Sequence, residues 1–340
     1  MDSPNGAIPK KPRSWSRSLP FLTDILGNSL SDRLLFAVPK KGRLHQACLD
    51  LLHGSDIQFH RHSRLDIALV KNLPIALIFL PAADIPTFVG EGRVDLGITG
   101  QDQVAEHECV VPPTETTGVT EVLDLGFGKC LLQVQVPEKG VLAEPQDLIG
   151  KNVVTSFTNL TEQYFRRLER LLAEQTGNAF DAASPLKTKI KYVGGSVEAA
   201  CALGVADGIV DLVESGETMR AAGLKAISTV MSTTAVLIKS KHPSNPELVD
   251  LITARIKGVI TAQKYVLCTY NIERTRLETA MKITRGRRAP TITTLEEEGW
   301  VAVQVMVERK DIAVAMDRLT AAGAEDLMVI KLENSRTGSG

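Results

Sequence analysis

The chain has 340 residues, enough for two or three domains that each bury a core of their own. Its 39 lysines and arginines nearly balance 40 aspartates and glutamates, which argues against the basic surface of nucleic-acid-binding proteins. Aromatic residues make up 4%, too few for base-stacking surfaces, and no apolar run has the length of a membrane-spanning helix. We therefore expect neither a nucleic-acid nor a membrane partner.

The cysteines and histidines carry no recognisable site. The five cysteines are scattered singly without a Cys-x-x-Cys pair, as is typical of free thiols in a reducing compartment. The six histidines lack the spacing that a zinc site needs. These patterns predict a cytoplasmic protein.

Residues 1–30 predict a flexible N-terminal extension, because they contain four prolines, several serines and a basic cluster. A transit peptide is the alternative, since arginine and serine are frequent there. Asp24 interrupts the only apolar run and the prolines break any amphipathic helix, so the extension is the preferred interpretation.

A basic turn follows the first predicted strand. Residues 34–39 form a short apolar run, and Lys40, Lys41, Gly42 and Arg43 separate it from an amphipathic helix. Lysine and arginine at the carboxyl end of a parallel strand can bind a pyrophosphate or triphosphate, and Gly42 allows a close backbone approach. A solvated turn is the alternative.

The next segments alternate between strands and helices, as in a doubly wound α/β fold. Strands are expected over 64–69 and 75–80 and in the segment that leads to Asp102. Asp84 and Asp102 follow strands at the sheet edge where ligands bind such folds. Each of them could instead cap a helix.

A second αβ unit begins near residue 130 and contains three polar turns at strand ends. Residues 155–156, 194–196 and 214–218 should meet at one edge of its sheet. Helix capping explains each turn singly, whereas their convergence favours a phosphate site.

The third of these turns has the most informative sequence. It reads Glu214-Ser215-Gly216-Glu217-Thr218 and lies between an apolar strand and a short helix. Hydroxyls, free amides and the helix dipole there suit a phosphate, while Asp211 and Glu214 can accept hydrogen bonds from ribose hydroxyls. The alternative is a capped helix with Ser215 as N-cap.

The remaining chain returns to the first lobe through 235–238 and a helix at 246–264. Residues 265–331 then predict strand, helix, two strands, helix and strand, the ferredoxin-like order. This small unit has no acid, base or metal cluster, so binding or assembly is its expected role. We divide the chain into an extension (1–30), lobe I (31–129 and 240–265), lobe II (130–239) and a C-terminal domain (266–340).

Several separated motifs resemble the ATP phosphoribosyltransferase family in its long, fungal-type form. They are Pro39–Leu44, Asp84–Val89, Asp95–Asp102, Gly204–Lys225 and Arg285–Thr291, and the resemblance runs from about Leu34 to Glu333. Glu214 and Arg285 depart from the residues that are usual in the family.

The resemblance implies a two-lobed, periplasmic-binding-protein-like catalytic core and a ferredoxin-like (βαββαβ) regulatory domain. It implies transfer of phosphoribosyl from phosphoribosyl diphosphate to ATP with Mg²⁺, inhibition by L-histidine, and a homo-hexamer. For this reaction, the strand-end positions motivate the following assignments: for catalysis, Lys41 and Arg43; for phosphoribosyl diphosphate, Asp211, Glu214, Ser215, Gly216, Glu217 and Thr218; and for ATP, Arg64, Asp84 and Asp102. For histidine, Asn271 and Thr291 match positions near the effector site of the family.

Two other functions would use a similar architecture. A prephenate-dehydratase-like lyase combines a two-lobed core with a small regulatory domain, and a non-catalytic amino-acid sensor could do so too. Neither needs a basic turn facing a hydroxyl-rich phosphate loop, so binding of phosphoribosyl diphosphate discriminates against both.

Overall fold

The computed structural model describes residues 30–62, 65–177, 181 and 184–336. The fold described below is that of the unit that begins at Leu34. The predicted N-terminal extension lies almost wholly outside the described residues.

The first lobe is built on a six-stranded sheet with the order β2-β3-β1-β4-β11-β5. Its strands are β1 (Leu34–Pro39), β2 (Ile67–Leu69), β3 (Ile75–Leu80), β4 (Leu96–Gly100), β5 (Val119–Asp124) and β11 (Ala235–Ser240). Its helices are α2 (His45–Gly54), α3 (Ile85–Gly90), α4 (Gln101–Glu108) and α8 (Pro246–Lys264). Strands β1, β3 and β4 are parallel and almost wholly buried, as their continuous apolar sequences require.

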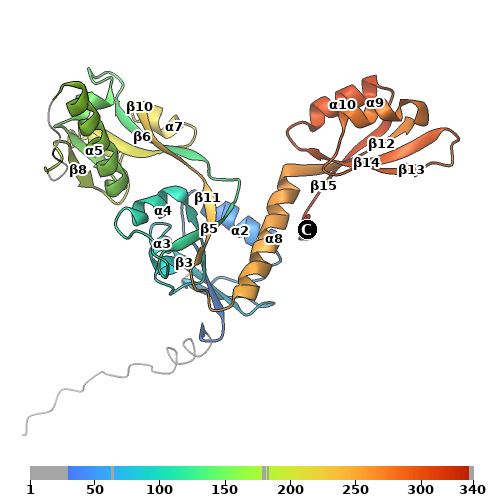
Figure 1. Ribbon diagram of the computed structural model, residues 1–340, viewed down its shortest axis with the longest axis horizontal. Helices are drawn as coiled ribbons and strands as arrows, with labels where there is room; N and C mark the ends of the chain where they lie inside the picture. Colours follow the sequence, from blue (N-terminus) through green and yellow to red (C-terminus); the bar gives the residue numbers. More distant parts are fainter. Residues whose placement is uncertain (1–29, 63–64, 178–180, 182–183, 337–340) are drawn as a thin grey trace, which may run out of the picture. The chain divides into compact units, whose positions relative to one another are not determined.

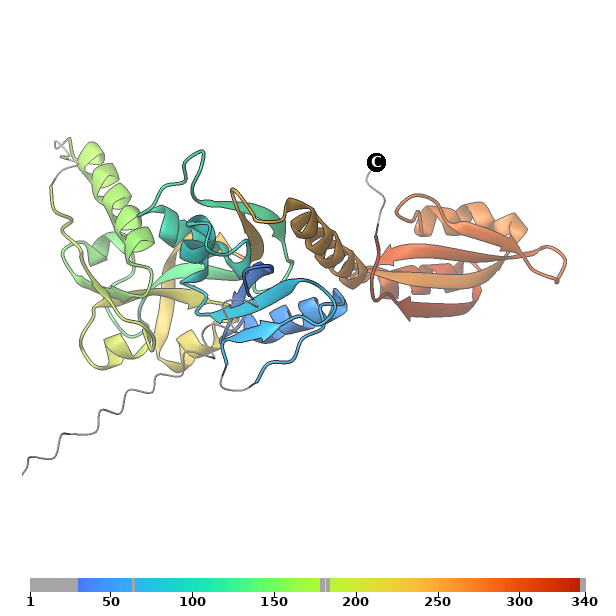
Figure 2. The same ribbon diagram turned by 90° about the horizontal axis from the view of Figure 1, so that it is seen from below.

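The second lobe is built on a five-stranded sheet with the order β10-β6-β9-β7-β8. Its strands are β6 (Cys130–Pro137), β7 (Asn152–Thr155), β8 (Lys189–Tyr192), β9 (Gly208–Val213) and β10 (Leu224–Thr233). Its helical segments are η1 (Pro145–Leu148), α5 (Thr158–Gln175), α6 (Ala199–Ala202) and α7 (Glu217–Ala221). Helix α5 lies against this sheet (Figures 1 and 2). Its Phe165 is fully buried in a core with residues of β6, β7 and β9.

The parallel strands of the second lobe bring three turns to one edge. Strand β7 pairs in parallel with both β8 and β9, so the turns after Thr155, Tyr192 and Val213 leave the same side of the sheet. That edge is where ligands bind open α/β sheets.

Two short segments join the first and second sheets. One comprises residues 125–129, between β5 and β6, and the other is Thr234, between β10 and β11. The chain thus re-enters the first sheet at Ala235, whereas the prediction divided the two lobes between residues 239 and 240.

A side chain of the first lobe caps a helix of the second. Phe157 at the N-cap of α5 makes no side-chain capping bond. Instead the Glu106 carboxylate of α4 accepts hydrogen bonds from the amides of Asn159, at 2.8 Å, and Leu160, at 2.9 Å. A negative charge stabilises the start of a helix there.

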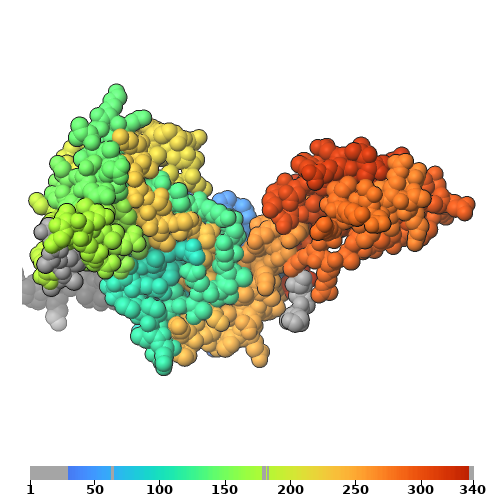
Figure 3. Space-filling view, turned by 45° about the horizontal axis from the view of Figure 1, so that its top comes forward, coloured from blue at the N-terminus to red at the C-terminus, as the bar shows by residue number. Residues whose placement is uncertain are grey.

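The C-terminal domain is a four-stranded antiparallel sheet with the order β13-β14-β12-β15. Its elements are β12 (Tyr265–Glu273), η2 (Arg274–Arg276), α9 (Leu277–Ile283), β13 (Thr291–Thr294), β14 (Trp300–Glu308), α10 (Ile312–Ala321) and β15 (Glu325–Lys331). Tyr270, Val303 and Leu319 belong to one core between this sheet and its helices. Figure 3 draws this domain in orange and red. The predicted fold class, a two-lobed α/β core with a ferredoxin-like domain, is confirmed.

None of the helices in the described ranges combines the length and hydropathy needed to span a bilayer. All five cysteines are free thiols, as the sequence predicts.

Candidate functional site

The loop between β9 and α7 turns at a glycine. Gly216 has φ 77°, a left-handed conformation that favours glycine, and it occupies the N-cap position of α7. The helix thus begins one residue later than in the alternative interpretation, which has Ser215 as N-cap. Helix α7 has only five residues, so any anion binding here depends on local amides and hydroxyls rather than on a helix dipole.

Several polar groups of this loop are open to solvent. Ser215, Glu217 and Thr218 are exposed, and the Ser215 hydroxyl accepts a long bond of 3.4 Å from the Glu217 amide. The amides of Gly216 and Thr218 form no hydrogen bond with the described part of the chain. The loop thus offers unpaired donors to a ligand, as a phosphate-binding turn must.

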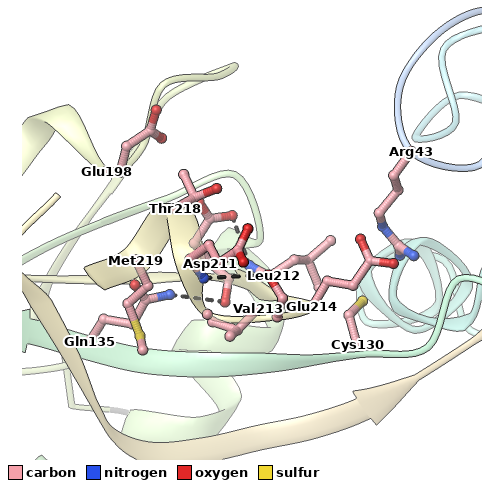
Figure 4. Close-up of a pocket in the computed structure, with 13 residues that line it drawn as sticks. Arg43, Cys130, Gln135, Glu198, Asp211, Leu212, Val213, Glu214, Thr218 and Met219 are labelled. Atoms are coloured by element: carbon pink, nitrogen blue, oxygen red, sulfur yellow. Dashed lines mark hydrogen bonds between the residues drawn. The ribbon is translucent and has the colours of Figure 1, made fainter. Parts of the chain in front are cut away.

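A cavity of about 210 Å³ contains all the residues predicted to bind phosphoribosyl diphosphate. They are Asp211, Glu214, Ser215, Gly216, Glu217 and Thr218. Arg43, from the basic turn of the first lobe, lines the same cavity, and Figure 4 shows its side chain extending toward Glu214 and Cys130. The structure therefore brings the basic turn and the loop to one site.

A second cavity, of about 190 Å³, adjoins the first. Lys41, Gly42 and Asp102 line it, and it shares Arg43 and Leu212 with the larger cavity. Arg43 is thus placed at the border between the two cavities, while Lys41 lines only the second.

Asp102 forms an ion pair with Arg43. Its side chain is 1% exposed, and its Oδ1 atom lies 3.5 Å from Nη2 of Arg43. The same carboxylate accepts hydrogen bonds from Thr233, at 2.6 Å, and from Gln103, at 3.1 Å. These contacts hold Asp102 inside the protein, beside the second cavity.

The other predicted ATP residues lie elsewhere. Asp84 is exposed at the N-cap position of α3, makes no side-chain capping bond and lines neither cavity. Arg64 lies outside the described residues.

The two predicted effector residues lie in the C-terminal domain. Asn271 on β12 donates a hydrogen bond to Asp326 at 2.9 Å. Thr291 begins β13 and lines a cavity of about 380 Å³ that also contains Arg287 and Arg288. Asn271 is not among the residues that line this cavity.

Burial changes the acid–base properties of the main site. It raises the pKa of Asp211 to about 6, with a smaller contribution from Glu198 and an opposing hydrogen bond from the Leu212 amide. Burial likewise raises the pKa of Cys130 to about 11, against the effect of Arg43. The Cys130 thiol is therefore neutral near pH 7 and is a poor nucleophile.

Sequence reasoning missed some residues of the main cavity, notably Gln135 and Glu198. Gln135 is 2% exposed and its amide donates to the Asp211 carbonyl at 3.3 Å. A glutamine within the apolar strand β6 was the available signal. Conversely, Thr155 bonds Val210 and lines no part of this cavity.

Comparison with known proteins gives consistent matches. The family model described as HisG: ATP phosphoribosyltransferase matches residues 81–258, and HisG, C-terminal domain, matches residues 262–334. An ATP phosphoribosyltransferase of Yarrowia lipolytica is 60% identical over 311 residues, covering 92% of this chain and 99% of that protein. Those of Schizosaccharomyces pombe and Saccharomyces cerevisiae are 56% and 54% identical, with the same coverage.

A solved structure shares the fold. A chain of the ATP phosphoribosyl transferase (HisG:HisZ) complex from Thermotoga maritima aligns with a TM-score of 0.51 and 22% identity, covering 66% of this chain and 96% of that chain. Two consecutive family models and relatives more than half identical over most of the chain thus accord with the basic turn and the loop. The chain belongs to the ATP phosphoribosyltransferase family, transferases of histidine biosynthesis.

Proposed function

We propose that the chain joins ATP to phosphoribosyl diphosphate, giving N1-(5-phosphoribosyl)-ATP and pyrophosphate, the first step of histidine biosynthesis. The observation that supports this reaction best is the single cavity lined by Arg43 and by the loop at 214–218. A phosphorylated sugar needs anion-binding donors and hydroxyl acceptors together, and this cavity offers both.

In the proposed reaction a bond forms between adenine N1 and ribose C1 while the bond from C1 to pyrophosphate breaks. Ser215, Gly216, Glu217 and Thr218 bind the 5′-phosphate, and Asp211 and Glu214 orient the ribose hydroxyls. Lys41 and Arg43 stabilise the charge that develops on pyrophosphate as it leaves with the bonding electron pair. No covalent nucleophile is required, and the neutral Cys130 thiol offers none.

The cavity also suits a magnesium ion that enters with the substrate. No cluster of three or more His, Cys, Asp or Glu side chains suited to a metal occurs in residues 30–62, 65–177 and 184–336. Carboxylates of Asp211 and Glu214 nevertheless line the cavity, and Mg²⁺ is commonly held by one or two carboxylates plus substrate phosphates. Bound there, the ion would share the pyrophosphate charge.

We further propose inhibition by L-histidine at the C-terminal domain, through Asn271 and Thr291. Neither residue lines the main cavity, so an effector there would act from a distinct site. Family membership also supports a cytoplasmic homo-hexamer.

Pyrophosphate release tests the reaction. The purified protein is incubated with ATP, phosphoribosyl diphosphate and Mg²⁺, with and without L-histidine. We expect release that depends on both substrates and that histidine suppresses. If histidine does not change the release, the proposed reaction stands and the proposed inhibition at the C-terminal domain is rejected. If folded, assembled protein releases no pyrophosphate, the proposed reaction is rejected.

A further inference from the structure

Thr233 lies where the chain passes from the second sheet to the first. It is the last residue of β10 and, like Asp102, almost fully buried, with exposures of 2% and 1%. The Thr233 hydroxyl donates to Asp102 Oδ1 at 2.6 Å and accepts from the Asp102 amide at 3.0 Å. One hydroxyl therefore fixes both the backbone and the carboxylate of Asp102.

The other segment that joins the sheets also holds Arg43. Its Nη1 atom donates to the Gly128 carbonyl at 2.5 Å, while Nη2 faces Asp102. The guanidinium is thus held by residues 125–129 on one side and, through Asp102, by Thr233 on the other.

Two glycines leave room for this arrangement. A Cβ atom at Gly100 would collide with the Asp102 carboxylate. At Gly128, which has φ +66°, a Cβ atom would collide with Leu44 and come within 3.0 Å of Arg43 Nη1. A side chain at Gly100 would therefore displace Asp102, and one at Gly128 would crowd Arg43.

We infer that Thr233 is a positioning residue for the transferase, because its hydroxyl fixes Asp102 and Asp102 fixes the Arg43 guanidinium between the two cavities. The inference rests on the proposed role of Arg43. A guanidinium held in place before the reaction stabilises a developing charge without first losing side-chain freedom. Thr233 directly precedes Thr234, the residue that joins the two sheets.

The first test compares two neighbouring threonines. Thr234 is also buried, and its hydroxyl bonds the Phe127 carbonyl at 3.0 Å and the Asp124 carboxylate at 3.2 Å rather than Asp102. We expect Thr233→Val to lower kcat about 10- to 100-fold with little change in the KM for ATP. Thr233→Ser should recover most of the activity, and Thr234→Val should lower kcat less than Thr233→Val does. Thermal unfolding of each variant controls for lost structure.

A double-mutant cycle separates this inference from the proposed role of Arg43. If Thr233 acts through Arg43, adding Thr233→Val to Arg43→Ala should lower kcat no further. Additive losses, or equal activities of the Thr233 and Thr234 valine variants, would overturn the inference. Wild-type activity of Arg43→Ala would instead overturn the role of Arg43. Should Thr233→Val not fold, Asp102→Asn replaces it in the cycle, since the amide loses the charge that faces Arg43.

Discussion

Arg43 is the side chain on which the proposed chemistry depends most. It borders both cavities and is 25% exposed, so a ligand can reach it from either side. Arg43→Ala should lower kcat by about 10²- to 10³-fold, because a preorganised charge opposite the leaving group is lost. Steady-state pyrophosphate release measures this effect.

Lys40 provides a matched control for that substitution. It belongs to the same basic turn but pairs with Asp66 at 2.7 Å, lies on the surface and lines neither cavity. Exposed ion pairs contribute little, so Lys40→Ala should retain near wild-type turnover and stability. Equal losses in both variants would mean that only the overall charge of the turn matters.

Asp211 predicts a specific pH dependence. With a pKa raised from 3.8 to about 6, the carboxyl takes up a proton as the pH falls below 6 and accepts hydrogen bonds less well. The KM of wild type for phosphoribosyl diphosphate should therefore rise below pH 6. In Asp211→Asn the KM should be higher at pH 8 and should approach that of wild type near pH 5. Protonation of the substrate phosphate affects both proteins alike and cancels in their ratio.

The raised pKa of Asp211 also predicts how the stability of the protein depends on pH. Because the pKa of Asp211 is raised in the folded protein, its contribution to the free energy of unfolding is fully present below pH 3.8. This contribution is lost as the pH rises through about 6. Asp211→Asn should accordingly have a higher Tm than wild type at pH 8, and the difference should shrink toward pH 4. A Tm difference that does not vary with pH would contradict the assignment.

At the scale of elements, the segment between β5 and β6 shapes the Arg43 site. Gly126 and Gly128 both have positive φ, but a Cβ atom at Gly126 meets nothing within 4 Å. Gly126→Ala should therefore incur only the backbone penalty, about 1 kcal/mol. Gly128→Ala should lose about 1–3 kcal/mol more and also lower kcat, because its methyl group displaces Arg43 and Leu44. The test measures the free energy of unfolding in denaturant and the kcat of both variants.

The sequence predicted individual strands and loops better than it predicted contacts between distant residues. Apolar runs such as 34–39 and 75–80 identify their strands because buried parallel strands need continuous apolar sequence. The polar loop after β9 could likewise be found, since its glycine and hydroxyls are adjacent in the chain. The partnership of Asp102 and Thr233 could not be found, because 131 residues separate them. Glu198 escaped notice for a similar reason, as only the fold brings it to the cavity.

For the whole molecule, the Glu106 cap is a direct link between the two lobes. Glu106→Ala should lower the free energy of unfolding by about 1–2 kcal/mol, because the first amides of α5 lose their acceptor. Hydrogen exchange should report the loss as faster exchange at Asn159 and Leu160. Glu108, on the same helix, makes neither contact, so Glu108→Ala should leave those amides protected. Unchanged exchange in Glu106→Ala would show that the cap contributes nothing.

Helix α8 passes into β12 without an intervening loop. Lys264 ends the helix and Tyr265 begins the strand, so no loop residue can absorb a rotation. In the middle of α8, Arg255 donates to the carbonyls of Ser55 and Asp56 in the first lobe. A ligand that displaces β12 would therefore act directly on α8, whose buried residues, among them Ile252 and Ile256, belong to the core of the first lobe.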